Sequence, residues 1–413
     1  MARIEPFKGL RPAKDKASVV ASPPYDVLNS QEAKVMVGDN KFAFLRISKP
    51  EVDLADGIDL YCDEVYAQGK KNFDWFIREK VLVQDKTRNF YLYKQIWGDH
   101  VQVGLVASAS CQDYLDDVIK KHEYTREDKE KDRMRHIETL NANSGPVFLT
   151  FKHRDDVDAL FAKAMEKEPE YDFVARNTVR QIFYVVDDPK LVDAIQKAFA
   201  SIDYLYVADG HHRSAAATNV KVLREKANPH HTGNEEYNFF LSVIFPDNQM
   251  KILPYNRVVK DLNGLTENEF FKKVKVCFDC EETHFKTPPH PDQFCMYMNG
   301  KWYLLIAKAG SYDTNDAVAS LDVSILQQNL LDPVLGIKNP RTDKRIDFVG
   351  GIRGTEELER LVNNGANKVA FSFHPTTIQQ LFNVADSGKV MPPKSTWFEP
   401  KLESGLVLHL LED

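Results

Sequence analysis

YLYVADGHHRSAAA, residues 204–217, joins an apolar run to a glycine and then to residues that favour a helix. A strand that turns through Gly210 into a helix aims several backbone N–H groups at one point, which suits a phosphate or a carboxylate. Aligned peptide dipoles already give that helix start about half a positive charge. His211, His212 and Arg213 add potentially cationic side chains to it. A bound anion would remove this conflict, so we expect an anion site here.

Each polar residue of this element has an expected task. The guanidinium of Arg213 can bind two phosphate oxygens, and histidines donate hydrogen bonds or exchange protons near neutral pH. Asp209 can hold a metal ion, here magnesium, or orient a histidine. We assign catalysis to Asp209 and His211, and phosphate or nucleotide binding to Gly210, His212, Arg213 and Ser214. The alternative is an ordinary polar helix start with Asp209 as its N-cap and two exposed histidines.

The segments around this element show strand and helix patterns in irregular order. Alternating apolar residues predict strands, and longer amphipathic runs predict helices. Strands are expected at 90–96, 101–109, 145–151, 178–186, 239–245 and 251–259, and helices at 57–81, 125–140 and 189–200. Because the two types do not alternate regularly, the expected fold class is α+β.

The chain is expected to divide into an N-terminal segment at 1–88, a core at 89–262 and a C-terminal α/β region at 263–413. In the last region Asn299-Gly300 predicts a tight hairpin turn within residues 295–307. The remaining strands and helices of that region are expected at 345–351, 356–365, 368–375, 377–386 and 405–411.

Composition and charge exclude several classes of protein. The 413 residues suffice for about two or three domains. Lys and Arg number 54 against 61 Asp and Glu, and a net charge of −7 has the wrong sign for a protein whose main ligand is DNA or RNA. No apolar run approaches about 18 residues, and the start MARIEPFKGLRPAKDK lacks the apolar centre of a secretion signal. We therefore expect a cytoplasmic protein with neither a membrane nor a nucleic-acid partner.

The five cysteines are an odd number scattered over a long chain, which argues against a disulfide framework. Cys277, Cys280 and His284 resemble part of a structural zinc site. However, the surrounding FKKVKVCFD alternates like a strand, in which Cys277 and Cys280 would point to opposite faces. We expect reduced thiols and no zinc.

Four motifs occur in order along the chain: SPPYDVLNSQEA at 22–33, KHEYTREDKEKDRMRHIETLNANSGPVFLTF at 121–151, YVADGHHRSAAA at 206–217 and VADSGKVMPPKSTWFEPKLESGL at 384–406. Together they resemble a large uncharacterised bacterial family that is similar to the ParB/sulfiredoxin superfamily and to free serine kinases. The resemblance implies a ParB/sulfiredoxin-like mixed α/β core with additional N- and C-terminal α/β segments.

The resemblance to free serine kinases also implies a reaction. The glutamate of the His122-Glu123 pair would accept the proton of a serine hydroxyl, while Asp209 to Arg213 would bind phosphates with magnesium. The donor would be ATP, ADP or pyrophosphate, and the acceptor serine or a similar hydroxyl metabolite, with phosphoserine consumed in the reverse direction. Lys129 and Arg133, four residues apart on a helix, would present a cationic face to phosphate. The alternative for this charged segment is a solvated helix with salt bridges.

Two related activities fit the sequence less well. Sulfiredoxin needs a cysteine where this chain has His211, so sulfinic acid reduction loses its nucleophile. ParB proteins read DNA with a helix-turn-helix, which this acidic chain lacks. A non-enzymatic ParB-like nucleotide-binding regulatory protein is the remaining alternative, and it would need the phosphate site but not Glu123.

Two loops supply further candidates for contact with the substrate. Tyr25 and Asp26 follow two prolines that stiffen the first loop. Lys394, Ser395 and Thr396 lie in an irregular stretch from which they can reach an anionic ligand. Ordinary loop packing is the alternative for both.

Overall fold

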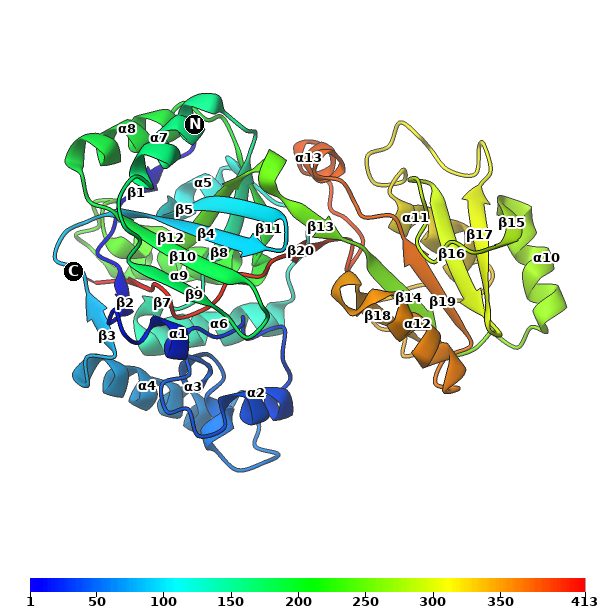
Figure 1. The fold of residues 1–413 in the computed structure, drawn as a ribbon, viewed down its shortest axis with the longest axis horizontal. Helices are drawn as coiled ribbons and strands as arrows, with labels where there is room; N and C mark the ends of the chain where they lie inside the picture. The colour runs from blue at the N-terminus through cyan, green and yellow to red at the C-terminus, as the bar shows by residue number, and fades with distance from the viewer. Residues whose placement is uncertain (413) are drawn as a thin grey trace. The chain divides into compact units, whose positions relative to one another are not determined.

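The computed structural model describes residues 1–412, and the chain forms two compact units. Unit 1 comprises Met1–Met250 together with the residues from Pro400 onward, and unit 2 comprises Lys251–Glu399 (Figure 1). This division differs from the expected segments in three places. Residues 1–88 are part of unit 1, and the boundary expected at residue 262 lies at residue 250. The residues from Pro400 onward, expected in the C-terminal region, also belong to unit 1.

The N-terminal segment belongs to unit 1 because its apolar side chains are buried against later parts of the chain. Phe44, Phe73 and Phe76 share one core cluster with Leu140 and Leu408. Separating the segment would expose these aromatic side chains to water, at a cost of about 1.5–3 kcal/mol each.

Unit 1 is built on a nine-stranded mixed sheet in the order β6-β11-β8-β12-β5-β4-β10-β9, with β1 beside β5. The pairs β6–β11 and β8–β12 are parallel, and the other pairs are antiparallel. The sheet strands are β1 (Ile4–Glu5), β4 (Phe90–Trp97), β5 (His100–Ser110), β6 (Ile119–Lys120), β8 (Val147–Phe151), β9 (Tyr171–Val174), β10 (Arg180–Val186), β11 (Leu205–Asp209) and β12 (Phe239–Pro246). Short pairs outside the sheet join β2 (Leu10–Pro12) to β3 (Leu82–Gln84) and β7 (Ala142–Asn143) to β21 (His409–Leu410).

Helices surround this sheet. Those of unit 1 are α1 (Ala17–Val20), α2 (Ser30–Val37), α3 (Leu45–Ser48), α4 (Asp63–Arg78), α5 (Cys111–Leu115), α6 (Glu127–Leu140), α7 (Asp155–Ala164), α8 (Pro189–Phe199) and α9 (His211–Ala227), with short 3₁₀ turns at Pro50–Asp53, Glu236–Asn238 and Asp247–Gln249. Figure 1 shows α7 and α8 together at one end of the unit and α3 and α4 beside α6 at the other. The central core cluster includes side chains of α7, α8 and α9 together with the strands.

The expected strand-turn-helix forms as β11 followed by α9. Gly210 takes a φ of 95°, in the left-handed region where glycine is favoured. A Cβ at this position would lie 3.4 Å from the Cα of Val147 in the neighbouring strand β8. The positive φ of the turn is therefore the reason for a glycine at this position.

Unit 2 contains a six-stranded antiparallel sheet in the order β15-β17-β16-β19-β14-β18, and β13 pairs with β20 beside it. Its strands are β13 (Lys251–Leu253), β14 (Tyr255–Val259), β15 (Phe278–Thr283), β16 (Gln293–Met298), β17 (Lys301–Ala307), β18 (Ile346–Gly350), β19 (Val369–Phe373) and β20 (Trp397–Glu399). Its helices are α10 (Glu267–Cys277), α11 (Asp322–Leu326), α12 (Gly354–Asn363) and α13 (Ile378–Asp386), with a π turn at Gln327–Leu331 and a 3₁₀ turn at Gly351–Arg353. The Asn299-Gly300 hairpin is confirmed, with φ of 51° and 78° at its two turn residues.

The mixed α/β character expected from the sequence is confirmed, and the relation of the core to the ParB/sulfiredoxin fold stays a prediction. Two local expectations were wrong. FKKVKVCFD is not a strand, because Thr266 and Glu269 form a capping box that starts α10 and the helix runs to Cys277. Residues 405–411 contribute only the two-residue strand β21. Within residues 1–412, no helix is both long enough and apolar enough to cross a membrane.

Candidate functional site

The parallel pairing of β6 with β11 brings two distant motifs together. Ile119 lies opposite Leu205 and Lys120 opposite Tyr206. Residues that follow parallel strands leave the sheet at the same edge. His122 and Glu123, just after β6, therefore meet the Asp209–Arg213 motif, which begins with the last residue of β11.

His211 occupies the centre of this meeting point. Its Nδ1 lies 4.0 Å from Glu123 Oε2, and its ring meets that of His122 edge to face with centroids 4.4 Å apart. His211 and His122 are buried, whereas 36% of the Glu123 side chain is exposed. The carboxylate that was expected to act as base thus has access to solvent and to a ligand.

The three histidines of the site are held neutral. Burial lowers the pKa of His211 to about 4, and burial with the neighbouring His211 lowers the pKa of His122 to about 3. Burial also lowers the pKa of His212. The backbone N–H of Arg126 donates to His212 Nε2 at 3.0 Å, so the proton of the neutral ring sits on Nδ1.

The charge conflict expected at the start of α9 is therefore smaller than the sequence indicates. Two of the three side chains that were counted as potential cations are neutral near pH 7. The third, Arg213, is paired with Asp26, whose two carboxylate oxygens lie 3.2 Å from its Nη2. The positive end of the helix dipole and its backbone N–H groups stay as the features that favour an anion.

Asp209 is engaged with a cation that the sequence-based analysis did not identify. Its Oδ2 accepts a hydrogen bond from Lys401 Nζ at 2.8 Å, and its Oδ1 accepts from the backbone N–H of Gly210 at 2.8 Å. Burial alone would raise the pKa of Asp209, but the charges of Lys401 and Arg213 outweigh it and hold that pKa well below its usual range. Lys401 lies within the motif at 384–406, and its spacing from Asp209 gives no local signal.

A magnesium ion at Asp209, as expected from the sequence, would have to share the carboxylate with the ammonium group of Lys401. Magnesium requires an octahedron of oxygen ligands, usually one or two carboxylates with substrate phosphates and water. Both oxygens of Asp209 already accept hydrogen bonds. Among residues 1–412, no three His, Cys, Asp or Glu side chains gather in a metal-binding arrangement. We therefore assign no step to a metal held by Asp209.

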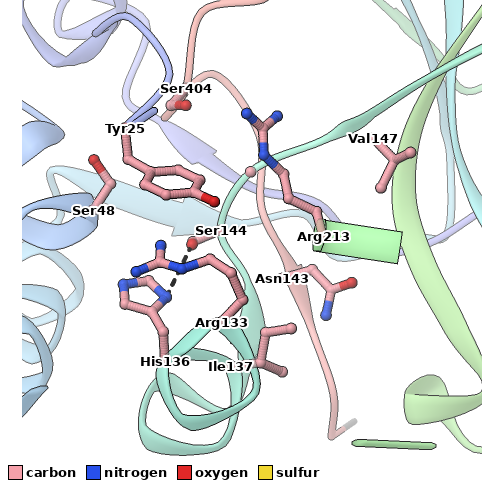
Figure 2. A pocket seen from close by; sticks show the side chains of 11 residues that line it. Tyr25, Ser48, Arg133, His136, Ile137, Asn143, Ser144, Val147, Arg213 and Ser404 are labelled. Carbon is pink, nitrogen blue, oxygen red and sulfur yellow. Dashed lines mark hydrogen bonds between the residues drawn. The ribbon is translucent and has the colours of Figure 1, made fainter. Parts of the chain in front are cut away.

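Tyr25, expected as a substrate contact, lies between two guanidinium groups (Figure 2). The Cζ of Arg133 is 4.0 Å from the centre of the Tyr25 ring, and that of Arg213 is 5.6 Å from it. Burial and the nearby Asp26 raise the pKa of Tyr25 to about 12, so its hydroxyl stays protonated. The SPPYDV loop thus contributes both Tyr25 and Asp26 to the surroundings of Arg213.

Lys129 and Arg133, expected to form one cationic face, contact different groups of the protein. Lys129 Nζ donates to the Tyr61 hydroxyl at 2.8 Å, whereas Arg133 pairs with Asp132 and stacks on Tyr25.

Ser214, expected to bind phosphate, turns back on its own helix. Its Oγ donates to the backbone oxygen of His211 at 3.0 Å, and the side chain is fully buried. This hydroxyl stabilises the first turn of α9.

Lys394, Ser395 and Thr396 belong to unit 2. Lys394 has a φ of 58°, and its Nζ lies 5.4 Å from the centre of the Tyr255 ring. The Ser395 hydroxyl donates to the backbone oxygen of Pro392 at 2.7 Å. Their assignment to substrate stays a prediction.

The cysteine cluster has a different geometry from the one that the strand pattern implied. Cys277 ends helix α10, while Cys280 lies in strand β15. All five cysteines of the chain are free thiols.

Comparison with protein families gives a clear match. A family model described as a protein of unknown function, DUF1015, matches residues 4–324, which is more than half of the chain. The family resemblance expected from the sequence is thereby confirmed, and the chain belongs to this family. Three of the four motifs lie within the matched residues, and the motif at 384–406 lies outside them. No curated protein matches the chain.

Several solved structures are similar at low sequence identity. A free serine kinase in complex with AMP shares 14% identity over 73% of this chain and 92% of its own, with a TM-score of 0.35. SbnI from Staphylococcus aureus, with a C-terminal truncation, shares 11% identity over 72% of this chain and 84% of its own, with a TM-score of 0.38. A conserved hypothetical protein from Pyrococcus furiosus shares 14% over 73% of this chain and 95% of its own, with a TM-score of 0.34.

Proposed function

We propose that this DUF1015 protein is a phosphotransferase acting on the hydroxyl of a small metabolite of the serine type. The donor is a nucleotide or pyrophosphate, and the reverse reaction consumes phosphoserine or its analogue. The main support is the position of Glu123, whose partly exposed carboxylate lies 4.0 Å from neutral His211 at the start of α9. A proton acceptor is thus adjacent to a helix start that favours phosphate.

The geometry suggests one division of tasks. The substrate hydroxyl oxygen attacks the terminal phosphorus of the donor while its proton passes to Glu123. The bond between that phosphorus and the donor's bridging oxygen breaks, and the donor leaves with the bonding electrons. A hydroxyl is a weak nucleophile, so a positioned carboxylate contributes about 10²–10⁴ to the rate. Neutral His211, at 4.0 Å from this carboxylate, can donate a hydrogen bond to it when the two groups move closer.

The phosphate end of the reaction would rely on cations of the protein. Lys401 forms an ion pair with Asp209, which lies just before the start of α9. The backbone N–H groups at the start of α9 add a partial positive charge. These charges stabilise the negative charge of the transferring group. Asp209 holds Lys401 in place in this scheme.

The alternative is a nucleotide-binding regulatory protein without catalysis. The ion pair between Asp209 and Lys401 favours this alternative, because it engages the carboxylate that a kinase would be expected to offer to a metal ion. Such a protein would use the start of α9 but would have no need of Glu123.

The test is an assay of the pure protein with serine and ATP, ADP or pyrophosphate, with and without magnesium, and with phosphoserine in the reverse direction. Glu123→Gln keeps the size of the side chain and removes the basic oxygen. We expect turnover to fall by about 10²–10⁴, while the affinity for the donor changes little.

Glu127→Gln is the matched control, because Glu127 lies nearby at the start of α6, with an 81% exposed side chain paired to Lys131. It should leave turnover unchanged. A fully active Glu123→Gln protein would remove the glutamate from the mechanism. Donor binding without turnover of any of these substrates would favour the regulatory protein.

A further inference from the structure

A cavity lies next to Arg213, whose side chain is part of its lining (Figure 2). Its volume is about 30 Å³. Tyr25, Arg133 and Arg213 line it, together with Ser48 at the end of α3 and Asn143 in β7. Its walls thus come from segments that are far apart in the sequence.

Three side chains that line this cavity carry a buried hydrogen-bond donor without a partner in the protein. The donors are Ser48 Oγ, Asn143 Nδ2 and Arg213 Nε. Ser48 is 6% exposed and Asn143 5% exposed, so bulk water does not satisfy them. A buried donor without a partner costs about 1–3 kcal/mol. Three such groups in the lining of one cavity favour a ligand that accepts hydrogen bonds.

The other polar groups of the Asn143 and Arg213 side chains already have partners, which identifies the chemistry of the donors that are left. Asn143 Oδ1 accepts from the backbone N–H of Leu241 at 3.2 Å. Arg213 Nη1 donates to the backbone oxygen of Pro146 at 2.7 Å, and its Nη2 pairs with Asp26. The groups left without a partner on the Asn143 amide and the Arg213 guanidinium are therefore N–H donors.

A ligand that accepts hydrogen bonds fits these donors better than a single water molecule. Water accepts about two hydrogen bonds, whereas a carboxylate accepts about four through its two oxygens. An oxygen anion would also gain from the guanidinium groups of Arg213 and Arg133.

We infer that this cavity binds the carboxylate group of a small metabolite. A phosphate dianion fits less well, because each guanidinium is already paired with an aspartate: Arg213 with Asp26 and Arg133 with Asp132. The four charges sum to zero, and burying two negative charges there costs more than burying one. Carboxylate binding is a property of this cavity alone and does not require phosphoryl transfer at the start of α9.

The test is calorimetric titration of the full chain, without any nucleotide, with L-serine, L-lactate, serinamide and inorganic phosphate. L-serine and L-lactate carry a carboxylate, whereas serinamide has an amide in its place. We expect the two carboxylates to bind, and serinamide and phosphate to bind at least about tenfold more weakly.

Two variants link this binding to the cavity. Asn143→Asp keeps an oxygen for the Leu241 N–H and replaces the free N–H donor with a negative oxygen, so carboxylate affinity should fall by at least about tenfold. Ser48→Ala removes an unpartnered hydroxyl, so the protein without ligand should melt at the same or a higher temperature while carboxylate affinity falls several-fold.

Ser324→Ala is the matched control, because Ser324 is also buried and unpartnered but lies in α11 of unit 2. It should leave carboxylate affinity unchanged. Equal binding of L-lactate by wild type and Asn143→Asp would overturn the inference, as would preferential binding of phosphate or no binding of any carboxylate. Glu123→Gln should bind L-lactate normally, so a failure of the phosphotransferase proposal is distinguishable from a failure of this one.

Discussion

Asp209 and Glu123 are two carboxylates near His211, and their surroundings differ. Asp209 accepts hydrogen bonds from Lys401 and from the Gly210 backbone, and it is held ionised by cations. Glu123 faces a neutral histidine and exposes 36% of its side chain. A carboxylate fixed by a cation is a poor proton acceptor, because protonation would break its ion pair. Under the proposed function, the comparison favours Glu123 over Asp209 as the proton acceptor and leaves Asp209 a positioning role.

The difference arises from chain topology. Lys401 reaches Asp209 because the residues from Pro400 onward return to unit 1 after unit 2 is complete. Glu123 reaches His211 because β6 pairs in parallel with β11. Two environments at one helix start are thus set by segments from distant parts of the chain, which is how one site can separate the roles of two carboxylates.

The neutral histidines beside Glu123 predict the largest effect, which is a dependence of stability on pH. Below about pH 6.5 the unfolded chain binds protons at His122 and His211, whereas the folded protein binds them only near pH 3 and 4. The free energy of unfolding should therefore be highest above pH 6.5 and fall between pH 6.5 and 4. The slope per histidine approaches about 1.4 kcal/mol per pH unit. Urea titrations across this range measure it.

His211→Gln serves as the comparison variant, because it removes one of the histidines that the fold holds neutral. Its unfolding free energy should depend less steeply on pH than that of wild type. Identical pH profiles for the two proteins would mean that His211 is not held neutral by the fold.

Removing the cation that pairs with Asp209 should lower the stability of the protein. Lys401→Met keeps most of the side-chain length and leaves Asp209 without its ammonium partner. We expect a loss of about 2 kcal/mol in unfolding free energy, less than the ~3–5 kcal/mol of a fully buried pair, because 34% of the Asp209 side chain is exposed. Urea denaturation provides the measurement.

The double variant Lys401→Met/Asp209→Asn should recover most of this loss. The introduced asparagine would keep an oxygen for the Gly210 N–H and carry no charge. If the single and double variants are equally unstable, the Lys401 stem contributes by packing, and the ion pair does not fix Asp209.

The smallest expected effect concerns Lys129 in α6 and tests whether the phosphate site extends to this residue. Lys129 donates to Tyr61, so Lys129→Gln should change stability by less than about 0.5 kcal/mol and leave donor affinity and turnover unchanged. Isothermal titration with ATP and the serine assay test this. A clear loss of donor affinity would extend the phosphate site to Lys129 and restore the cationic face expected from the sequence.

Local patterns predicted most elements because they depend on residues close in sequence. The hairpin of β4 and β5, the Asn299-Gly300 turn and the passage of β11 into α9 all follow from alternation or from glycine in turns. The strand expected around Cys277 failed for a related reason. Its alternating residues fit a strand, but the Thr266–Glu269 capping box starts a helix and overrides that pattern.

The candidate site was predictable only in part. The sequence identified Glu123, Asp209, Arg213 and Tyr25, but it missed Lys401 and the unpartnered donors of Ser48 and Asn143. No short spacing connects these residues, and the protonation state of a histidine depends on burial, which a linear pattern does not contain.

The amino-acid sequence by itself determined the family, the mixed α/β class and the residue types that gather at the start of α9, because these depend on composition, motifs and local periodicity. Only the tertiary structure decided which charges meet. Lys401 forms an ion pair with Asp209, and Asp26 forms one with Arg213. Burial keeps His211 uncharged. Electrostatic energy depends on distance through space and on exposure to water, and both are set by long-range strand pairing and by the return of the C-terminal residues to unit 1.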